Sequence, residues 1–567
     1  MKTTIDISGF DDYRNVLDDT LSRLHRDGIV SRIRARDYTV WKPVPDEIVN
    51  RLGWIDTPNM MRDHVHRMQK LVTDVSSEGY THALVLGMGG SSLAPEVFRK
   101  IFGVRNTYLD LSILDSTDPA AILYRTSRLS LSRTLIIVAT KSGTTAETIS
   151  FFKFFLSIMC NTVGHREAGR HFIAITDPGS ELARLAEKHS FRATFLNPPD
   201  IGGRYSALSF FGLVPAALIG IDIPFILNRS FEAAQNFEEK NVISGNNNPG
   251  AYLGGIIGAL GLAGRDKLTF LISPQIKAFG NWVEQLIAES LGKEGRGILP
   301  VVDESPGTPE VYGTDRLFVY IHLGWDSSLN ERVRSIQKAG YPLITVEVQD
   351  LYEIGAQFFI WEAATAVIGH LMGINPFDQP NVEAAKRLAG EMIFDYVETG
   401  RLPAEQPGQT DDVVTLFGTA YGATPIDTLK SFLEGADPGA YIGLQAYLQP
   451  KAEHDESLAQ LRTAIRDRYR RATTLGYGPR YLHSTGQLHK GDAGKGHFIQ
   501  FTTDDLQDVP IPDSTNGLSS SVTFGILKQA QALGDRRALQ NAGRKVLRVH
   551  LGKDIIGGLT HLIEGLR

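Results

Sequence analysis

The sequence predicts an α/β protein with doubly wound, parallel β-sheets. Short apolar runs alternate along the chain with longer stretches of helical periodicity, and this alternation is typical of a parallel sheet covered by helices. With 567 residues the chain is too long for one ordinary core, so two or three domains are expected. Loops rich in glycine and hydroxyl groups follow two of the apolar runs, at the edge where such sheets bind ligands.

The expected strands, in order, are Ala83–Leu86, Leu135–Ala139, Phe172–Thr176, Leu268–Ile272, Leu317–Ile321 and Leu343–Val348. The helical patterns between them cover residues 62–77, 145–159, 181–188, 278–291 and 356–372. A break at residues 222–250, which contains Pro224 and a run of Gly and Asn, separates two α/β domains. We therefore expect a helical extension over residues 1–60, a first domain over 61–230 and a second over 231–400.

The composition indicates a cytoplasmic protein. A net charge of −6 and a pI near 6.2 give no basic face for nucleic acid. The only cysteine, Cys160, excludes an internal disulfide and a cysteine-built zinc site, and favours a reducing compartment. The N-terminus lacks the pattern of a signal peptide, and no apolar run reaches the length of about 20 residues that a membrane helix needs. We expect neither a nucleic-acid nor a membrane partner.

The stretch from Gly87 to Ser92, Gly-Met-Gly-Gly-Ser-Ser, follows the first expected strand and leads into a helix. Glycines let the backbone approach a ligand closely, and free N–H groups at a helix start favour an anion such as a phosphate. A dinucleotide-binding loop would need glycine at the position of Ser92, which disfavours that interpretation. An ordinary turn is the other alternative.

A second loop of the same design follows the next expected strand. Its polar residues are Thr140, Lys141, Ser142, Thr144 and Thr145. These hydroxyls and one cation could hold several oxygens of one phosphate, with Glu147 ordering the loop. Hydroxyls at helix starts are often only caps, but two such loops on successive expected strands favour a ligand site.

Two further segments supply candidates for the chemistry. Arg204 follows Gly202 and Gly203 in a loop, where its guanidinium could face an oxyanion; a surface arginine in a turn is the alternative. Gln285 and Glu289 are four residues apart and share one helix face. Glu289 suits a general base if it lies in a cleft, and a solvated helix glutamate is the alternative.

The C-terminal half adds three polar candidates. Gln379 precedes Pro380, which starts a helix that carries Lys386. His483 lies in a polar loop, although a lone histidine is often structural. His64 and His66 are close in sequence but lack nearby carboxylate partners, so we expect a helix face there and no metal site.

Together these motifs resemble those of the glucose-6-phosphate isomerase family, and most of all the isomerase half of bacterial chains that fuse a transaldolase to this enzyme. The matching segments are Gly87–Ser91, Thr140–Glu147, Gly202–Ser206, Gln285–Gly292 and Asn375–Lys386. They span most of residues 80–390. A transaldolase half is not evident, so we expect a single activity.

The resemblance implies a fold of two flavodoxin-like sugar isomerase (SIS) domains and a role for each candidate. The implied phosphate pocket consists of Ser91, Thr140, Lys141, Ser142 and Thr145. Glu289, with Gln285 beside it, would move a proton between C1 and C2, and Arg204 would stabilise the enediolate. Gln379 and Lys386 match the family's C-terminal helix motif, in which the lysine contacts the ring oxygen.

His483 matches the family's ring-opening histidine, within a His-Ser-Thr-Gly-Gln motif. In the family this motif precedes the Asn-Pro-Phe-Asp-Gln helix, whereas here it follows. We therefore expect a permuted C-terminal segment, residues 476–567, that completes the second domain, after a loop-rich and helical insertion over 401–475. His370, inside an apolar helix, is a weaker candidate.

The expected activity is reversible isomerisation of glucose 6-phosphate and fructose 6-phosphate through ring opening and an enediol(ate), without a cofactor or metal. The expected partners are a small-molecule sugar phosphate and a second copy of the chain in a homodimer. Two alternatives are an isomerase that also accepts mannose 6-phosphate and a non-catalytic SIS-type sugar-phosphate sensor. A sensor could dispense with Glu289, Lys386 and His483, all of which are present.

Overall fold

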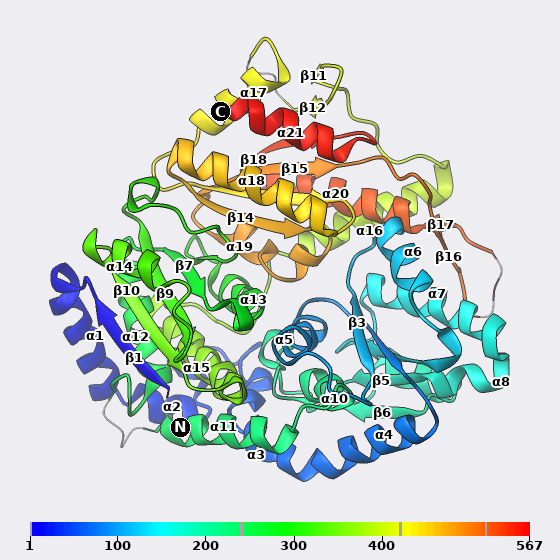
Figure 1. Cartoon of the computed structure of the whole chain (residues 1–567), viewed down its shortest axis with the longest axis horizontal. Coiled ribbons are helices and arrows are strands. Elements are labelled where there is room, and N and C mark those ends of the chain that lie inside the picture. The colour runs from blue at the N-terminus through cyan, green and yellow to red at the C-terminus, as the bar shows by residue number, and fades with distance from the viewer. Residues whose placement is uncertain (1–2, 239–242, 419–421, 516, 518) are drawn as a thin grey trace.

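The described residues form three open β-sheets flanked by helices and one short hairpin (Figure 1). The computed structural model describes residues 3–238, 243–418, 422–515, 517 and 519–567, so residues 239–242 of the expected domain break lie outside it. In Figure 1 the first sheet lies at the right, the second at the left and the third at the top. The predicted α/β class with parallel sheets is confirmed, with one sheet more than expected.

The first sheet has the strand order of a flavodoxin-like fold. Its parallel strands, in the order β3-β2-β4-β5-β6, are Asp110–Leu114, His82–Leu86, Thr134–Ala139, Phe172–Thr176 and Ala193–Leu196. Its helices are α4 (Val65–Ser77), α5 (Leu93–Phe102), α6 (Pro119–Ser127), α7 (Ala146–Val163), α8 (His165–Ala168), α9 (Glu181–Lys188) and α10 (Phe210–Leu218). The chain crosses from one side of β2 to the other between β3 and β4, so the carboxyl ends of β2 and β4 form the topological switch point.

The second sheet repeats this order and adds an antiparallel edge strand. In the order β1-β10-β9-β7-β8 its strands are Thr4–Ser8, Leu343–Val348, Arg316–Leu323, Lys267–Ile272 and Leu299–Val301. Its helices include α12 (Pro249–Leu262), α13 (Phe279–Leu291), α14 (Asn330–Lys338) and α15 (Ile354–Met372), with α1 (Arg14–Arg26), α2 (Ile29–Arg34), α3 (Thr57–Met60) and α11 (Ile223–Asn236) nearby in Figure 1. The expected purely helical extension over 1–60 is therefore wrong in part, because β1 pairs with β10 at the open edge.

The helix over Leu351–Met372 is, by length and composition alone, apolar enough to cross a membrane. It does not stand out in the sequence, because its apolar residues are interrupted by polar ones such as Gln357, Glu362 and His370. In its most apolar window 89% of the residues are buried inside the protein. This helix therefore serves as the core helix of the second domain.

The third sheet corrects the expected organisation of residues 401–567. In the order β11-β12-β18-β15-β13-β14 its strands are Gln409–Thr410, Thr415–Phe417, Lys545–His550, Gly496–Thr502, Tyr441–Tyr447 and Ala472–Tyr477. Its helices are α17 (Pro425–Glu434), α18 (Ala452–Tyr469), α19 (Gly486–Gly491), α20 (Phe524–Asn541) and α21 (Ile555–Leu566), and a hairpin joins β16 (Pro510–Ile511) to β17 (Val522–Thr523). Residues 401–475 thus contribute β11, β12, β13 and most of β14, and the strands of residues 476–567 pair with them and not with the second sheet. The reason is a separate apolar core around Ile442, Leu444 and Leu458.

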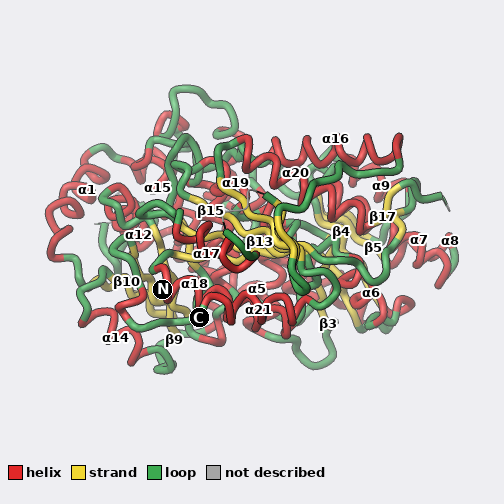
Figure 2. The backbone as a smooth tube through the Cα atoms, turned by 90° about the horizontal axis from the view of Figure 1, so that it is seen from above, coloured by secondary structure: helices red, strands yellow, loops and turns green. Residues whose placement is uncertain are grey.

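The third domain nevertheless contacts the other two closely. Helix α19 packs on α13, and a Cβ added at Gly292 would lie 2.3 Å from Cα of Leu488. Helix α16 (Glu383–Thr399) runs beside α20 in both views (Figures 1 and 2). The segment that carries His483 is therefore held against the second domain without joining its sheet.

Candidate active site

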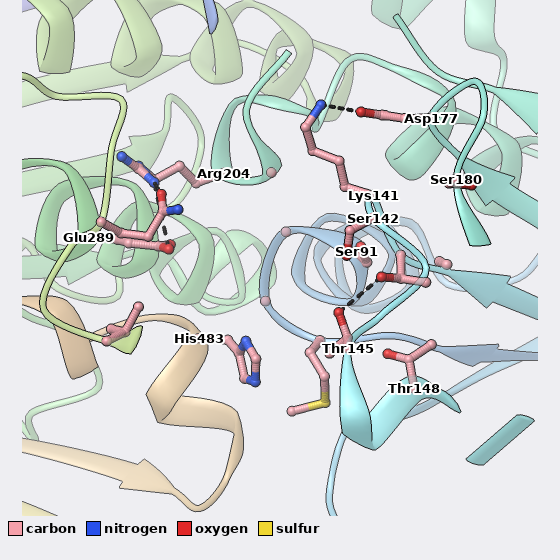
Figure 3. Close-up of a pocket in the computed structure, with 18 of the residues that line it drawn as sticks. Ser91, Lys141, Ser142, Thr145, Thr148, Asp177, Ser180, Arg204, Glu289 and His483 are labelled. Atoms are coloured by element: carbon pink, nitrogen blue, oxygen red, sulfur yellow. Dashed lines mark hydrogen bonds and ion pairs between the residues drawn. The ribbon is translucent and has the colours of Figure 1, made fainter. Parts of the chain in front are cut away.

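A cavity of about 590 Å³ opens at the switch point of the first sheet (Figure 3). Every site residue predicted from the sequence lines it: Ser91, Thr140, Lys141, Ser142, Thr145, Arg204, Gln285, Glu289, Gln379, Lys386 and His483. They come from the loops after β2 and β4, a turn before α10, helix α13, the segment before α16, the first turn of α16 and the 3-10 turn at Arg480–His483. A volume of this size suits a small phosphorylated ligand.

The glycine loop after β2 owes its composition to close backbone contacts. Gly89 has a φ of +55°, and a Cβ there would lie 2.8 Å from the Gln285 amide nitrogen. A Cβ on Gly90 would lie only 2.0 Å from the carbonyl oxygen of Gly203. Glycine is therefore required at both positions so that this loop can approach α13 and the Arg204 turn.

The hydroxyl loop after β4 does not behave as a set of helix caps. Thr140 and Thr145 share a hydrogen bond of 3.0 Å between their hydroxyls, as do Ser142 and Thr144 at 2.8 Å. Among the described residues neither Thr145 nor Ser92, the N-cap residues of α7 and α5, caps its helix through its side chain. Two helices without a side-chain cap thus begin next to loops that line the same cavity, an arrangement that favours an anion.

Lys141 lies at the far side of this loop, held by two oxygens. Its ammonium donates to Asp177 Oδ2 at 2.5 Å and to the Pro199 carbonyl at 2.7 Å. Burial raises the pKa of Asp177 above its ordinary value even though Lys141 lowers it. An ammonium has three N–H groups, so Lys141 can also donate to an oxygen of a bound anion beside these two acceptors.

The acid–base candidate Glu289 is fixed by its neighbours on both sides. Gln285 donates its amide to Glu289 Oε2 at 3.0 Å and to the carbonyl of His483 at 2.7 Å. The nearest Arg204 nitrogen lies 3.6 Å from Glu289 Oε1. Gln285 therefore ties the carboxylate to the segment that carries the histidine.

Arg204 is almost fully buried, with 3% of its side chain exposed. Its guanidinium donates to the Ser290 hydroxyl at 2.7 Å, to Gln379 Oε1 at 2.9 Å and to the carbonyls of Pro376 and Asp378 at 2.8 and 2.9 Å. An arginine has five N–H groups, so one remains without a hydrogen bond to a described residue. That N–H belongs to Nη1, the nitrogen nearest Glu289.

His483 reaches the cavity from the same chain and is paired with a glutamate. Its Nε2 lies 3.0 Å from Glu147 Oε1. Burial raises the pKa of Glu147, but the charge and hydrogen bond of His483 more than offset this, and the pKa is lowered overall. Glu147 therefore orients the histidine, whereas we expected from the sequence that it orders the hydroxyl loop. Because an ionised carboxylate only accepts, His483 donates to it from Nε2 in either charge state, and in the neutral state its other ring nitrogen can accept a proton.

The two remaining candidates differ in their surroundings. Lys386 is 46% exposed and pairs with Glu383 at 2.9 Å at the cavity rim. His370 lies outside the cavity lining; its Nδ1 contacts the carbonyl of Val40 at 2.7 Å. The structure thus brings Lys386 to the site and leaves His370 in the core, as its apolar neighbours indicated.

Sequence reasoning missed several polar residues that line the cavity: Arg51, Thr148, Asp177 and Ser180. Arg51 comes from the N-terminal region and pairs with Glu47 at 2.7 Å. Asp177 and Ser180 follow β5, the strand after β4 in the sheet. The position of Asp177 at the carboxyl end of a predicted strand is a signal that could have identified it.

The family model for phosphoglucose isomerase matches residues 54–302. A glucose-6-phosphate isomerase of Rubrobacter xylanophilus is 28% identical, over 69% of this chain and 98% of that protein. A probable glucose-6-phosphate isomerase of Methanococcus maripaludis is 26% identical, over 67% and 93%. The predicted resemblance is thereby confirmed.

Two solved structures share the fold. A hypothetical protein of Thermus thermophilus has a TM-score of 0.58 at 22% identity, covering 68% of this chain and 99% of that chain. A glucose-6-phosphate isomerase of Chlamydia trachomatis has a TM-score of 0.52 at 18% identity, covering 69% and 85%. About a third of this chain lies outside each alignment.

Proposed function

We propose that this chain, like the glucose-6-phosphate isomerases that it resembles, is an aldose–ketose isomerase that interconverts glucose 6-phosphate and fructose 6-phosphate. The observation that carries the proposal is the convergence of separate sequence motifs, from residues 91 to 483, on one cavity at the switch point of the first sheet. These side chains are far apart in the sequence and meet only because the fold brings them together. Their common location supports one joint function.

We propose that the substrate phosphate binds between the glycine loop after β2 and the hydroxyl loop after β4. The hydroxyls of Ser142 and Thr145, the uncapped helix starts and the ammonium of Lys141 supply donors and positive charge. A dianion held there fixes one end of the sugar chain. The reactive carbons then lie within reach of α13, and this positioning lowers the entropic cost of the reaction.

Ring opening requires a proton to leave one sugar oxygen and another to reach the ring oxygen. In the proposal His483, oriented by Glu147, takes the proton from the anomeric hydroxyl, and the Lys386 ammonium at the rim donates a proton to the ring oxygen. The ionised Glu147 stabilises the imidazolium that forms when His483 accepts a proton.

Isomerisation then moves a proton between C2 and C1. Glu289 takes the proton from one carbon and returns it to the other, and the free N–H of Arg204 donates to the enediolate oxygen. Gln379 and Gln285 hold these two groups in place. The enediolate carries its negative charge next to a buried guanidinium, where the low dielectric strengthens the attraction.

The test is conversion of fructose 6-phosphate to glucose 6-phosphate by the wild type, by Glu289→Gln and by the control Glu331→Gln on the exposed α14. We expect turnover by the wild type and the control, and substrate binding with at least a thousandfold lower kcat for Glu289→Gln. A wild type that binds both sugar phosphates without converting them would overturn the isomerase and leave a sensor. Turnover of mannose 6-phosphate, measured beside it, defines the substrate range.

The proposal also includes a homodimer that acts in the cytoplasm, as the resemblance implies. Size-exclusion chromatography with light scattering measures the first point directly. A mass of one chain, 62.3 kDa, across the micromolar range would contradict it.

A further inference from the structure

Helix α20 of the third domain presents a buried polar stripe to the rest of the protein. Lys528, Gln531 and Asp535 are spaced by three and four residues, so they lie on one helix face. Their exposed fractions are 2%, 6% and 0%. Polar groups buried this deeply need specific partners, and each of the three has partners outside its own helix.

Gln531 contacts the pair that orients the ring-opening histidine. Its amide nitrogen donates to Glu147 Oε1 at 2.7 Å, the same oxygen that His483 Nε2 approaches at 3.0 Å. Its amide oxygen accepts from the Thr117 hydroxyl at 2.9 Å. The amide orientation is thereby defined, since a carboxylate can only accept from the nitrogen.

The neighbouring residues of the stripe fix Gln531 from both sides. One turn before it, Lys528 pairs with Asp118 at 2.9 Å, next to the residue that binds the Gln531 oxygen. One turn after it, Asp535 pairs with Lys490 of α19 at 2.5 Å and accepts from the Tyr481 hydroxyl at 2.5 Å. Helix α20 is thus anchored both to the first domain and to the turn that carries His483.

We propose that Gln531 is a positioning residue for ring opening, which holds the Glu147 carboxylate so that it presents one fixed oxygen to His483. The inference rests on the proposed function of the cavity. It adds a second residue of the third domain to the site, beside His483, and Gln531 lies outside residues 54–302, which the family model matches.

The physical reason is that one oxygen serves two donors. Without the amide, the carboxylate could rotate about its terminal bond and offer His483 either oxygen in more than one geometry. The other ionisable groups that influence the pair are Lys386 of α16, whose charge lowers the pKa of Glu147, and Tyr447 of β13, whose pKa burial and Asp535 raise. Neither supplies a hydrogen bond that could replace the amide of Gln531 among the contacts of the described residues.

The test compares Gln531→Met, which keeps the side-chain length and removes the donor, with Gln540→Met, the same change at an exposed position of α20. Two substrates are used. Fructose 6-phosphate must be ring-opened, whereas 5-deoxyfructose 6-phosphate lacks the hydroxyl that closes the ring and is already open. For Gln531→Met we expect kcat to fall about ten- to a hundredfold with the first substrate and less than threefold with the second. The acid limb of its pH profile with the first substrate moves to higher pH, because the carboxylate loses a donor that favours its charged form.

An equal decrease in kcat for both substrates, or no decrease for either, would overturn the inference. A wild type that converts neither substrate would instead reject the proposed function. ¹⁵N NMR of the His483 ring tests the positioning role independently of activity. We expect the Nε2-protonated form in the wild type and in Gln540→Met, and a mixture of ring forms in Gln531→Met. An unchanged spectrum in Gln531→Met would contradict the positioning role whatever the activity.

Discussion

Replacement of Arg204 by lysine tests how the structure holds its central cation. The guanidinium donates four hydrogen bonds, to Ser290, Gln379 and two backbone carbonyls, and it is buried. A lysine ammonium presents its three N–H groups from a single point and cannot span acceptors on different sides of a planar fork. At least two of the four bonds are therefore lost in Arg204→Lys.

The loss of unfolding free energy in Arg204→Lys depends on which of the four acceptors still receive a hydrogen bond from another donor. Hydrogen bonds to a charged group contribute about 1.5–3 kcal/mol each, so two lost bonds would cost about 3–6 kcal/mol. The Asp378 carbonyl also accepts from Lys293, and the Pro376 carbonyl from Tyr205 at 3.4 Å. These partners reduce the cost to about 3 kcal/mol of unfolding free energy. The enediolate also loses its donor, which lowers kcat/KM by about a hundred- to a thousandfold.

Urea unfolding and steady-state kinetics with fructose 6-phosphate measure the two effects. Arg387→Lys is the matched control, since Arg387 is 66% exposed and forms an ion pair with Glu391 on the surface of α16; surface changes of this kind stay within about 0.5 kcal/mol. An Arg204→Lys protein that lies within about 1 kcal/mol and threefold of the wild type would refute the argument from planar geometry.

Three further predictions concern the loops and the His483 partner. Gly90→Ala should destabilise the fold by about 1–3 kcal/mol and lower activity, because its Cβ meets a carbonyl at 2.0 Å. Gly203→Ala, whose Cβ meets no described atom within 4 Å, should leave the stability unchanged and serves as the control for unfolding only, since Gly203 also lines the cavity. Equal unfolding midpoints for the two variants would contradict this. Glu147→Gln should be less stable than the wild type at neutral pH, because a carboxylate whose pKa is lowered by folding stabilises the folded state above its unfolded pKa. The difference in unfolding free energy should shrink as the pH falls through the lowered pKa of Glu147. Unfolding curves over a pH series measure this difference, and a difference that grows in acid would contradict the prediction. Lys141→Met should raise the KM for fructose 6-phosphate about tenfold and weaken inhibition by inorganic phosphate, since the partly buried Asp177 then loses the cation that offsets its charge next to the anion. An unchanged inhibition constant for phosphate would contradict a role of Lys141 in binding the phosphate.

The sequence predicted β2, β4 and β5 of the first sheet and β7, β9 and β10 of the second, because these strands carry a continuous apolar signal, but it missed the strands β1, β3, β6 and β8. The six residues of β4 are all buried, and so are those of β7, so alternation with helices was enough to place them. In the third sheet β13 is buried, and so is β15 except for its last residue, but these two strands contain polar residues such as Gln445, His497 and Gln500, which weaken that signal. Which strands pair is a long-range property, and one sequence does not reveal it.

Site residues that directly follow a strand could be predicted from the sequence. Residues whose role is to hold another side chain could not be predicted as well. Ser91, Thr140 and Lys141 come directly after β2 and β4, so fold class alone places them at one edge. Glu147 was noticed but given the wrong task, because its partner His483 is 336 positions away. Gln531 has no sequence signal, since a glutamine in a helix is ordinary until the fold places it against a carboxylate.

The displaced histidine shows that contacts between helices, and not the order of segments along the chain, build this site. Gln487, four residues after His483, donates to the Gly292 carbonyl at 2.9 Å and accepts from the Asn381 backbone at 2.8 Å. These contacts seat the His483 turn between the end of α13, which carries Glu289, and the start of α16, which carries Lys386. The lack of a side chain at Gly292 lets Leu488 approach the end of α13. A third domain can therefore supply the His483 segment as long as this contact surface on α13 is kept. The position of His483 in the sequence is therefore free to vary, whereas its distance from Glu147 and Glu289 is set by the packing of α19 and α20.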